Sequence, residues 1–283
     1  MSRPLRITYP GALYHITARG NKKGEIFLDD RDREVFLEKL ATVITHHNWI
    51  CHAYCLMGNH YHLLIETVEA NLSDGMRDLN KDYSQAFHRL HKTVGHLFQG
   101  RFQAFVIEKE VYLLEVACYI VLNPVRAGMV KHPALWRWSS FAANAGLIDT
   151  PSFLTIDWIL EHFSYDRKQA QLAYIEFVMA GIKEDSPFRD LAHRSILGSP
   201  QFVTHMWEQC KDSHLITEIA RQDRIVGRPD LEEIFTREQT RNERDKAVVF
   251  ARVGCGYSVA EIARFLKMSR TRISIISRKK EES

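Results

Sequence analysis

The chain has 283 residues, of which 45% are hydrophobic and 26% charged, as in a globular protein with a sizeable core, and its net charge of +3 does not by itself identify a polyanionic partner. Its five cysteines form no Cys-x-x-Cys pair, which favours reduced thiols over a disulfide framework. No apolar run reaches the roughly 20 residues that cross a bilayer, and the N-terminus lacks the apolar segment of a signal peptide, so we expect a cytoplasmic protein with no membrane partner.

The first half of the chain alternates between strand and helix patterns. Period-two runs and apolar residues at helical spacing predict, in chain order, strand 12–19, a helix capped by Asp29 or Asp30, strands 49–57 and 60–66, a helix capped near residue 71, strand 102–108 and helix 110–122. We expect the last helix to stop at Asn123-Pro124, because proline disfavours helical geometry in the residue before it. The order predicts an α+β fold, a ferredoxin-like β-α-β-β-α-β antiparallel sheet with an appended catalytic helix.

The second half is predicted to be all-helical. We divide the chain into an α+β domain over 1–148, a helical connector over 149–200 and a helical DNA-binding region over 201–283. The last region ends in a helix–turn–helix pattern, in which Ser258 and Ser269 cap two short helices. The second of these helices projects three basic side chains, which predicts duplex DNA binding by Arg270, Arg272 and Arg278. A plain helical bundle with a basic tail is the alternative.

Two histidines, His60 and His62, flank one tyrosine at the start of a predicted strand. Side chains alternate faces along a strand, so the two imidazoles lie on one face and can share a metal ion. A structural zinc site is the alternative, because Cys51 and Cys55 are expected to share a face of the preceding strand. His15 is expected to be a core or DNA-contact residue rather than a ligand.

Tyr119 and Asn123 are four residues apart and therefore lie on one face of their predicted helix. A phenol beside a metal-bound phosphate is a competent nucleophile, and the asparagine amide oxygen can complete the metal's protein ligands. Attack on a DNA phosphate would keep the bond energy in a phosphotyrosine link, so no ATP-binding loop is required. Tyr112, on about the same face, is the rival nucleophile.

Four motifs occur in order: PGALYHITARGN (10–21), MGNHYH (57–62), LFQGR (97–101) and YIVLNPVRAG (119–128). Together they resemble the REP-associated tyrosine transposases, bacterial relatives of the single-tyrosine insertion-sequence transposases within the histidine–hydrophobic–histidine (HUH) endonucleases. The resemblance covers roughly residues 10–140.

The resemblance implies an enzyme that cleaves single-stranded DNA near palindromic hairpins and leaves a 5′-phosphotyrosine. Tyr119 would be the nucleophile, His60 and His62 the metal ligands, and Asn123 a polar ligand. The cofactor would be Mg²⁺ or Mn²⁺, of which Mn²⁺ suits imidazoles better. Further candidate DNA contacts are Arg19, Lys22, Lys23, Lys81, Arg89, Arg101 and Arg126. The alternative is a DNA-binding regulator with dormant chemistry, and either protein would be a monomer or a homodimer.

Overall fold

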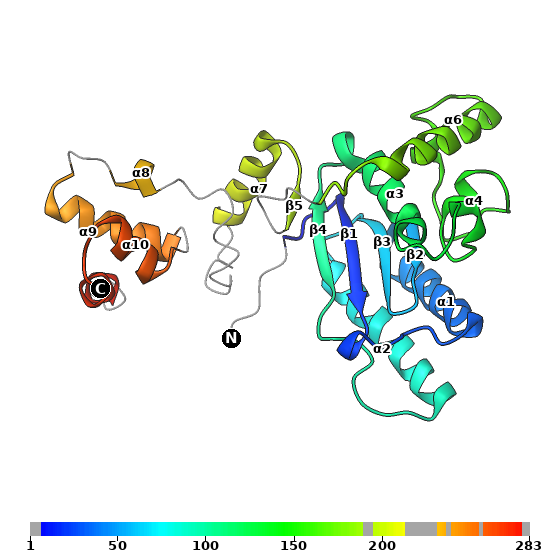
Figure 1. The fold of residues 1–283 in the computed structure, drawn as a ribbon, viewed down its shortest axis with the longest axis horizontal. Helices are drawn as coiled ribbons and strands as arrows, with labels where there is room; N and C mark the ends of the chain where they lie inside the picture. The colour runs from blue at the N-terminus through cyan, green and yellow to red at the C-terminus, as the bar shows by residue number, and fades with distance from the viewer. Residues whose placement is uncertain (1–6, 189–194, 213–230, 236–238, 255–256, 279–283) are drawn as a thin grey trace. The chain divides into compact units, whose positions relative to one another are not determined.

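The computed structural model describes residues 7–188, 195–212, 231–235, 239–254 and 257–278. The chain divides into two compact units, the first made of residues 8–191 and 196–199 and the second containing residues 200–283. Strands and helices mix in the first unit (Figure 1), which confirms the predicted α+β class. Among the described residues, no helix is long and apolar enough to cross a membrane.

A five-stranded sheet forms the centre of the first unit. Its strands are β1 (Ala12–Arg19), β2 (Trp49–Leu56), β3 (His60–Thr67), β4 (Gln103–Ile107) and β5 (Ile196–Leu197). They lie in the order β2-β3-β1-β4-β5, with β5 parallel to β4 and every other neighbouring pair antiparallel. β5 falls in the stretch predicted to be a helical connector, because a two-residue strand that pairs with a distant partner leaves no local pattern.

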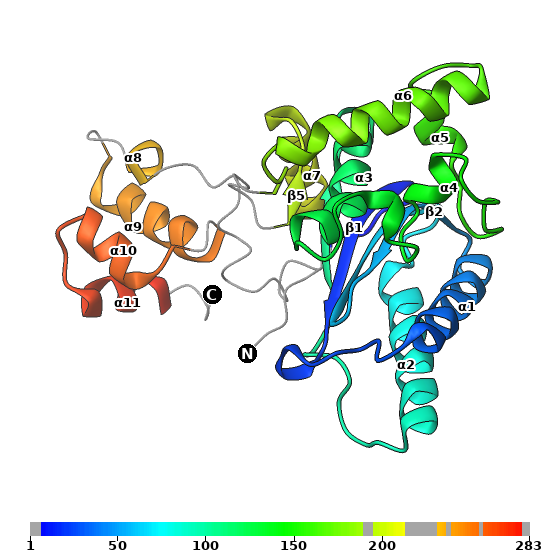
Figure 2. The same ribbon diagram turned by 45° about the vertical axis from the view of Figure 1, so that its right-hand side comes forward.

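Helices cover both faces of this sheet (Figure 2). On one face, α1 (Asp30–His46) and α2 (Leu72–His91) pack against each other, and Phe36 of α1 contacts Tyr61 of β3. On the other face, Leu64 of β3 shares a core with helices α3 to α6. These are α3 (Lys109–Arg126), α4 (Phe141–Asn144), α5 (Asp157–Leu160) and α6 (Arg167–Ala180). Tyr61 and Leu64 thus face opposite layers, as the strand alternation predicts.

Three 3-10 helices join these elements, namely η1 (Asn21–Lys23), η2 (Pro133–Leu135) and η3 (Gly181–Lys183). The helices α5 and α6 belong to the same compact unit as the sheet, whereas the sequence prediction placed them in a separate connector over 149–200. The reason is burial, because Tyr174 and Val178 of α6 are buried in the core that α3 forms.

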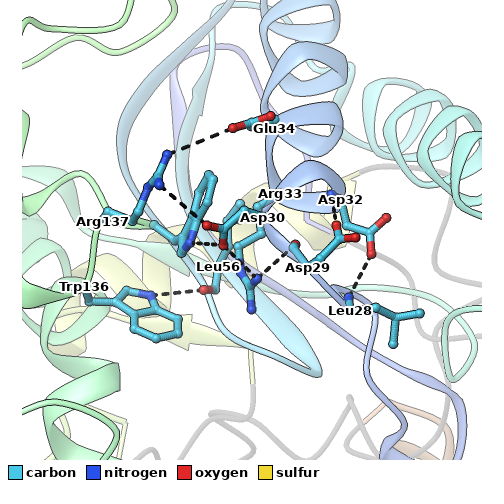
Figure 3. Close-up of polar contacts among 10 residues, drawn as sticks. Leu28, Asp29, Asp30, Asp32, Arg33, Glu34, Leu56, Trp136 and Arg137 are labelled. Carbon is cyan, nitrogen blue, oxygen red and sulfur yellow. Dashed lines mark hydrogen bonds and ion pairs between the residues drawn. The ribbon is translucent and has the colours of Figure 1, made fainter.

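A tryptophan-rich segment closes the free edge of β2 (Figure 3). Its backbone pairs with the strand, since the amide of Leu56 donates to the carbonyl of Trp138 at 2.8 Å. The indole of Trp136 donates to the Leu56 carbonyl, and that of Trp138 donates to Asp30 at the start of α1. Arg33 lies over both indole rings. This segment therefore protects an edge that would otherwise expose unpaired backbone groups.

Helix α3 runs to Arg126, and the prediction that it stops before Pro124 is wrong. A proline in a helix leaves the carbonyl four residues earlier without its usual N–H donor. In α3 that carbonyl belongs to Ile120, and it accepts from the side-chain amide of Asn123 at 3.3 Å. The same amide nitrogen donates to the Tyr119 carbonyl at 2.9 Å. The Asn123 side chain thus supplies the hydrogen-bond donor that Pro124 lacks.

A β-bulge at His52 changes the facing of the cysteines in β2. The register with β3 shifts between Cys51 and Ala53, so Cys51 lies opposite Ile65 while Cys55 lies opposite His62. Ile65 and His62 point to different faces of β3, because they are an odd number of residues apart. The expectation that Cys51 and Cys55 share a face is therefore wrong. The alternative of a structural zinc site that includes both cysteines falls with it.

The second unit is helical where it is described. Its elements are α7 (Pro200–Asp212), α8 (Leu231–Ile234), α9 (Arg241–Val249), the π-helical turn η6 (Phe250–Gly254), α10 (Val259–Phe265) and α11 (Arg270–Arg278). Ser258 begins α10 with a reciprocal capping box to Glu261. Ile262 of α10 and Ile273 of α11 are fully buried in one small core. Two short helices joined by a tight turn are thus present at the predicted positions.

Candidate active site

Three histidines lie together on the face of the sheet that α3 covers. His60 and His62 come from β3, and His15 comes from the neighbouring strand β1. The ring centroids of His60 and His62 are 5.0 Å apart, and those of His15 and His62 are 5.2 Å apart with nearly parallel planes. The pairing of β1 with β3 produces this cluster. Thr17 lies opposite His62, and His15, two residues before Thr17 in β1, projects from the same face of the sheet as Thr17.

Each of the two predicted ligands is held by one ring nitrogen. Asn59 Oδ1 lies 2.7 Å from His60 Nδ1, and His15 Nε2 lies 2.9 Å from His62 Nδ1. A carbonyl oxygen can only accept, so His60 Nδ1 carries the proton and its Nε2 carries the lone pair. His62 Nε2 is buried and has no hydrogen-bond partner among the described residues. Metal-binding histidines are typically fixed in this way through their second nitrogen.

The electrostatics of the cluster keep the imidazoles neutral, which is the form that binds metals. Burial lowers the pKa of His15 to about 3. Burial and the charge of Arg19 lower the pKa of His60 to about 4. Burial and the neighbouring His15 and His60 hold the pKa of His62 well below its usual value. Two neutral imidazoles with open Nε2 atoms therefore fit a divalent transition metal.

These histidines do not complete a metal site with other strong ligands. In the part of the chain that the structure describes, no three His, Cys, Asp or Glu side chains are grouped to hold a metal ion. A metal at His60 and His62 would need oxygen ligands from an amide, water or phosphate. Asn123 uses its amide nitrogen inside α3, so its Oδ1 is the atom that could serve as a ligand.

Tyr119 projects from α3 onto the histidine cluster. Its ring meets those of His62 and His15 edge-on, at centroid distances of 6.1 and 5.9 Å. The guanidinium carbon of Arg126 lies 5.1 Å from the centroid of the Tyr119 ring. Phe188 packs against both residues, with its ring centroid 5.2 Å from that of Tyr119 and 4.7 Å from that of His15. Tyr119 therefore lies beside the proposed ligands, partly covered by one aromatic side chain.

A cavity of about 460 Å³ opens onto the histidines. Its lining is Thr17, Ala18, Arg19, His60, His62, Gln99, Arg101 and Gln103. Arg19 and Arg101 contribute positive charge beside His60, which suits the phosphates of a nucleic acid. Tyr119 is not among the lining residues, although its ring centroid lies 6.1 Å from that of His62. The structure thus brings two of the predicted cations directly to the proposed metal ligands.

The other predicted DNA contacts are not among the residues that line this cavity. Lys22 and Lys23 are exposed in η1, and the Asn59 side chain donates to the Lys23 carbonyl. Arg89 is exposed on α2. Arg126 donates through Nη2 to the carbonyls of Gly181 and Glu184, so this end of its guanidinium is held inside the protein. Lys81, on α2, lines a second cavity. In the second unit, Arg270 and Arg272 are exposed on α11. The side chain of Arg278 lies outside the described residues.

Three contributors to the site are absent from the predicted set. Asn59 is part of the His60 motif, and its place next to a proposed ligand was a usable signal. His15 has the alternating pattern of β1, but its partner depends on strand pairing. Phe188 carries no sequence signal, because it reaches Tyr119 only through the packing of η3 on α3.

Comparisons with known proteins bear on this unit. Residues 8–123 match the family described as "Transposase IS200 like", a segment that includes His60, His62, Tyr119 and Asn123. No curated protein sequence matches the chain. One similar solved structure is the "Structure of the REP associates tyrosine transposase bound to a REP hairpin", with 20% sequence identity, coverage of 56% of this chain and 91% of that chain, and a TM-score of 0.46.

Proposed function

We propose that the first unit, whose residues 8–123 match the family described as "Transposase IS200 like", is a metal-dependent tyrosine transposase that cuts and rejoins single-stranded DNA. The observation that carries the proposal is the placement of Tyr119 edge-on to His62, with its ring 6.1 Å away and His60 beside it. A nucleophile and two neutral imidazoles on one face are the parts that phosphoryl transfer by tyrosine requires. The strand and helix order supports a ferredoxin-like arrangement in which α3 is the catalytic helix.

The cofactor would be Mg²⁺ or Mn²⁺, held by His60 and His62 through Nε2 and by Asn123 through Oδ1. Such an ion supplies positive charge that withdraws electrons from a phosphate and favours the tyrosine phenolate. Arg19 and Arg101 would bind neighbouring phosphates of the strand, because they line the cavity that exposes His60. Arg126, 5.1 Å from the Tyr119 ring centroid, adds a cation that stabilises negative charge on the phenol.

Cleavage then follows from the position of Tyr119. Its phenolic oxygen attacks the phosphorus, so that the bond from tyrosine oxygen to phosphorus forms as the bond from phosphorus to the 3′ oxygen breaks. The phenolic proton leaves to solvent, and the departing 3′ oxygen takes up a proton. The products are a 5′-phosphotyrosine and a free 3′-OH, and the reverse attack by a 3′-OH rejoins the strand. The motifs shared with REP-associated transposases suggest that the cleaved strand flanks a palindromic hairpin.

The second unit is proposed to bind duplex DNA through α10 and α11. The cap at Ser258, the shared core of Ile262 and Ile273, and the exposed Arg270 and Arg272 support a helix–turn–helix in which α11 enters the major groove. The alternative function, a DNA-binding regulator with dormant chemistry, rests on this unit alone.

The test is a covalent adduct between the full-length protein and a hairpin-bearing single-stranded oligonucleotide in Mn²⁺, seen on a denaturing gel. Wild type should form the adduct, and EDTA, Tyr119→Phe or His62→Gln should abolish it. Tyr112→Phe is the matched control and should retain it. If the wild-type protein binds the DNA but forms no adduct, the regulatory function is the correct one.

A further inference from the structure

His15 is a buried histidine that has no part in the proposed chemistry. It is 3% exposed and lies on β1, the middle strand of the sheet. Strand pairing places it between Leu64 of β3 and Phe105 of β4. The centroid of its ring is 5.9 Å from that of Phe105 and 4.7 Å from that of Phe188. A central strand and two aromatic neighbours therefore fix the orientation of this imidazole.

The hydrogen bond between His15 and His62 is aligned edge to edge. His15 Nε2 lies 2.9 Å from His62 Nδ1, while the ring centroids are 5.2 Å apart and the ring planes differ by 7°. The centroid distance exceeds the distance between the nitrogens by about one ring radius on each side. Both rings therefore lie in one plane, with the two nitrogens on the line between the centroids. Such alignment directs the N–H along the lone pair of its acceptor, which is the favourable geometry.

Two neutral imidazoles can share this bond in two ways, with opposite consequences for a metal. If His15 donates, His62 carries its proton on Nε2, and that nitrogen cannot bind a metal. If His62 donates through Nδ1, its Nε2 keeps the lone pair, and His15 carries its own proton on Nδ1. His15 Nδ1 is buried without a hydrogen-bond partner among the described residues. The aromatic rings around it, those of Phe105, Tyr119 and Phe188, are weak N–H acceptors. Metal binding selects the second arrangement.

We propose that His15 is a positioning residue, which accepts the hydrogen bond from His62 Nδ1 and so keeps the lone pair of His62 Nε2 available to the metal. It acts through His62 and does not bind the metal itself. Partners of this kind set the tautomer and orientation of a metal-binding histidine, and their loss typically lowers metal affinity 10–100-fold. The role of His62 as a ligand rests on the proposed function, while that of His15 rests on the in-plane hydrogen bond.

The experiment measures Mn²⁺ affinity of the full-length protein without DNA, from the electron paramagnetic resonance signal of free Mn²⁺. His15→Met fills the space but offers only a weakly accepting thioether, so it should bind Mn²⁺ about 10–100-fold more weakly. His15→Gln has a side chain of the same length with an amide oxygen as acceptor, and it should stay close to wild type. His52→Gln, at another fully buried histidine, which is paired with Glu66, is the control and should leave the affinity unchanged. Circular dichroism melts check that each variant folds.

Long-range ¹⁵N NMR of the wild-type protein with Mg²⁺ reads the two tautomers without any substitution. We expect the proton on Nδ1 of both His62 and His15, and a proton on His15 Nε2 would overturn the inference. Equal Mn²⁺ affinity in wild type and folded His15→Met would overturn it as well. So would a loss in His15→Gln as large as that in His15→Met, because packing alone would then explain both.

Adduct formation, measured against Mn²⁺ concentration, separates this inference from the proposed function. In His15→Met the Mn²⁺ concentration for the half-maximal rate should rise by the same factor as the loss of affinity, and the rate at saturating Mn²⁺ should return to that of wild type. A wild-type protein that binds Mn²⁺ and forms the Tyr119 adduct, with no change in His15→Met, refutes only the role of His15. A protein whose Mn²⁺ affinity falls in His15→Met and recovers in His15→Gln, but which forms no adduct, refutes only the proposed chemistry.

Discussion

Replacing Glu66 with glutamine should destabilise the first unit by about 2–3 kcal/mol at neutral pH. Glu66 Oε2 lies 2.9 Å from His52 Nε2 and accepts from Lys109 Nζ at 2.6 Å. The His52 side chain is fully buried, and the other two are 13% and 17% exposed. Hydrogen bonds to charged groups contribute roughly 1.5–3 kcal/mol each. A neutral amide keeps part of this network, which gives the lower combined figure. Lys109 is the first residue of α3, so the network ties the helix that carries Tyr119 to β3.

The same substitution should matter less in acid. Burial raises the pKa of Glu66, but the hydrogen bonds and charges of His52 and Lys109 lower it by more, so its pKa in the folded protein lies below the ordinary value of 4.5. A carboxyl with a lowered pKa stabilises the fold above its unfolded-state pKa and loses that contribution as the pH falls through its folded-state pKa. The deficit of Glu66→Gln should therefore shrink below about pH 4.5.

Urea unfolding at about pH 7 and about pH 3.5, followed by tryptophan fluorescence, measures both effects. A Trp207→Phe background leaves Trp49, Trp136, Trp138 and Trp158 as reporters, all in the first unit. Glu69→Gln, at an exposed position shortly after β3, is the matched control. An equal deficit at both pH values, or one no larger than that of the control, would refute the reasoning.

Three further predictions follow from the geometry. Phe188→Ala should increase the rate of adduct formation several-fold, because the Phe188 ring covers Tyr119 and His15. Phe177→Ala should leave the rate unchanged, and a slower reaction in Phe188→Ala would contradict this role of Phe188. Arg19→Gln should reduce the slope of log affinity against log salt by about 0.7 for single-stranded DNA, and the exposed Arg31→Gln should leave the slope unchanged. The double variant Arg270→Gln/Arg272→Gln should weaken duplex binding in a gel-shift assay without lowering adduct yield, and equal duplex binding would argue against α11 as a recognition helix.

Local patterns predicted much of the first unit. The alternating runs in β1 to β4 and the cap at Asp29 are decided by neighbouring residues, and the elements follow the predicted order. The bulge at His52 and the strand β5 were not predictable, because both are settled by pairing with distant residues. The extension of α3 through Pro124 depends on a side-chain bond from Asn123 that no propensity describes.

The candidate site was predictable only in part. The shared face of His60 and His62 follows from strand alternation, but their nearness to Tyr119 depends on how α3 crosses the sheet. Helical spacing linked Tyr119 to Asn123, and the shared motifs linked both to the histidines. The contact of Phe188 with Tyr119 comes from the packing of a segment far along the chain, which sequence patterns do not record.

The most direct test of the account is mass spectrometry of the tryptic peptide that contains Tyr119, after reaction with a hairpin-bearing single strand in Mn²⁺ and nuclease digestion. We predict a nucleotide phosphate attached to Tyr119 in the wild-type protein and no such adduct in Tyr119→Phe. Attachment to Tyr112 or another residue, or an adduct that persists in Tyr119→Phe, would contradict the assignment of Tyr119 as the nucleophile.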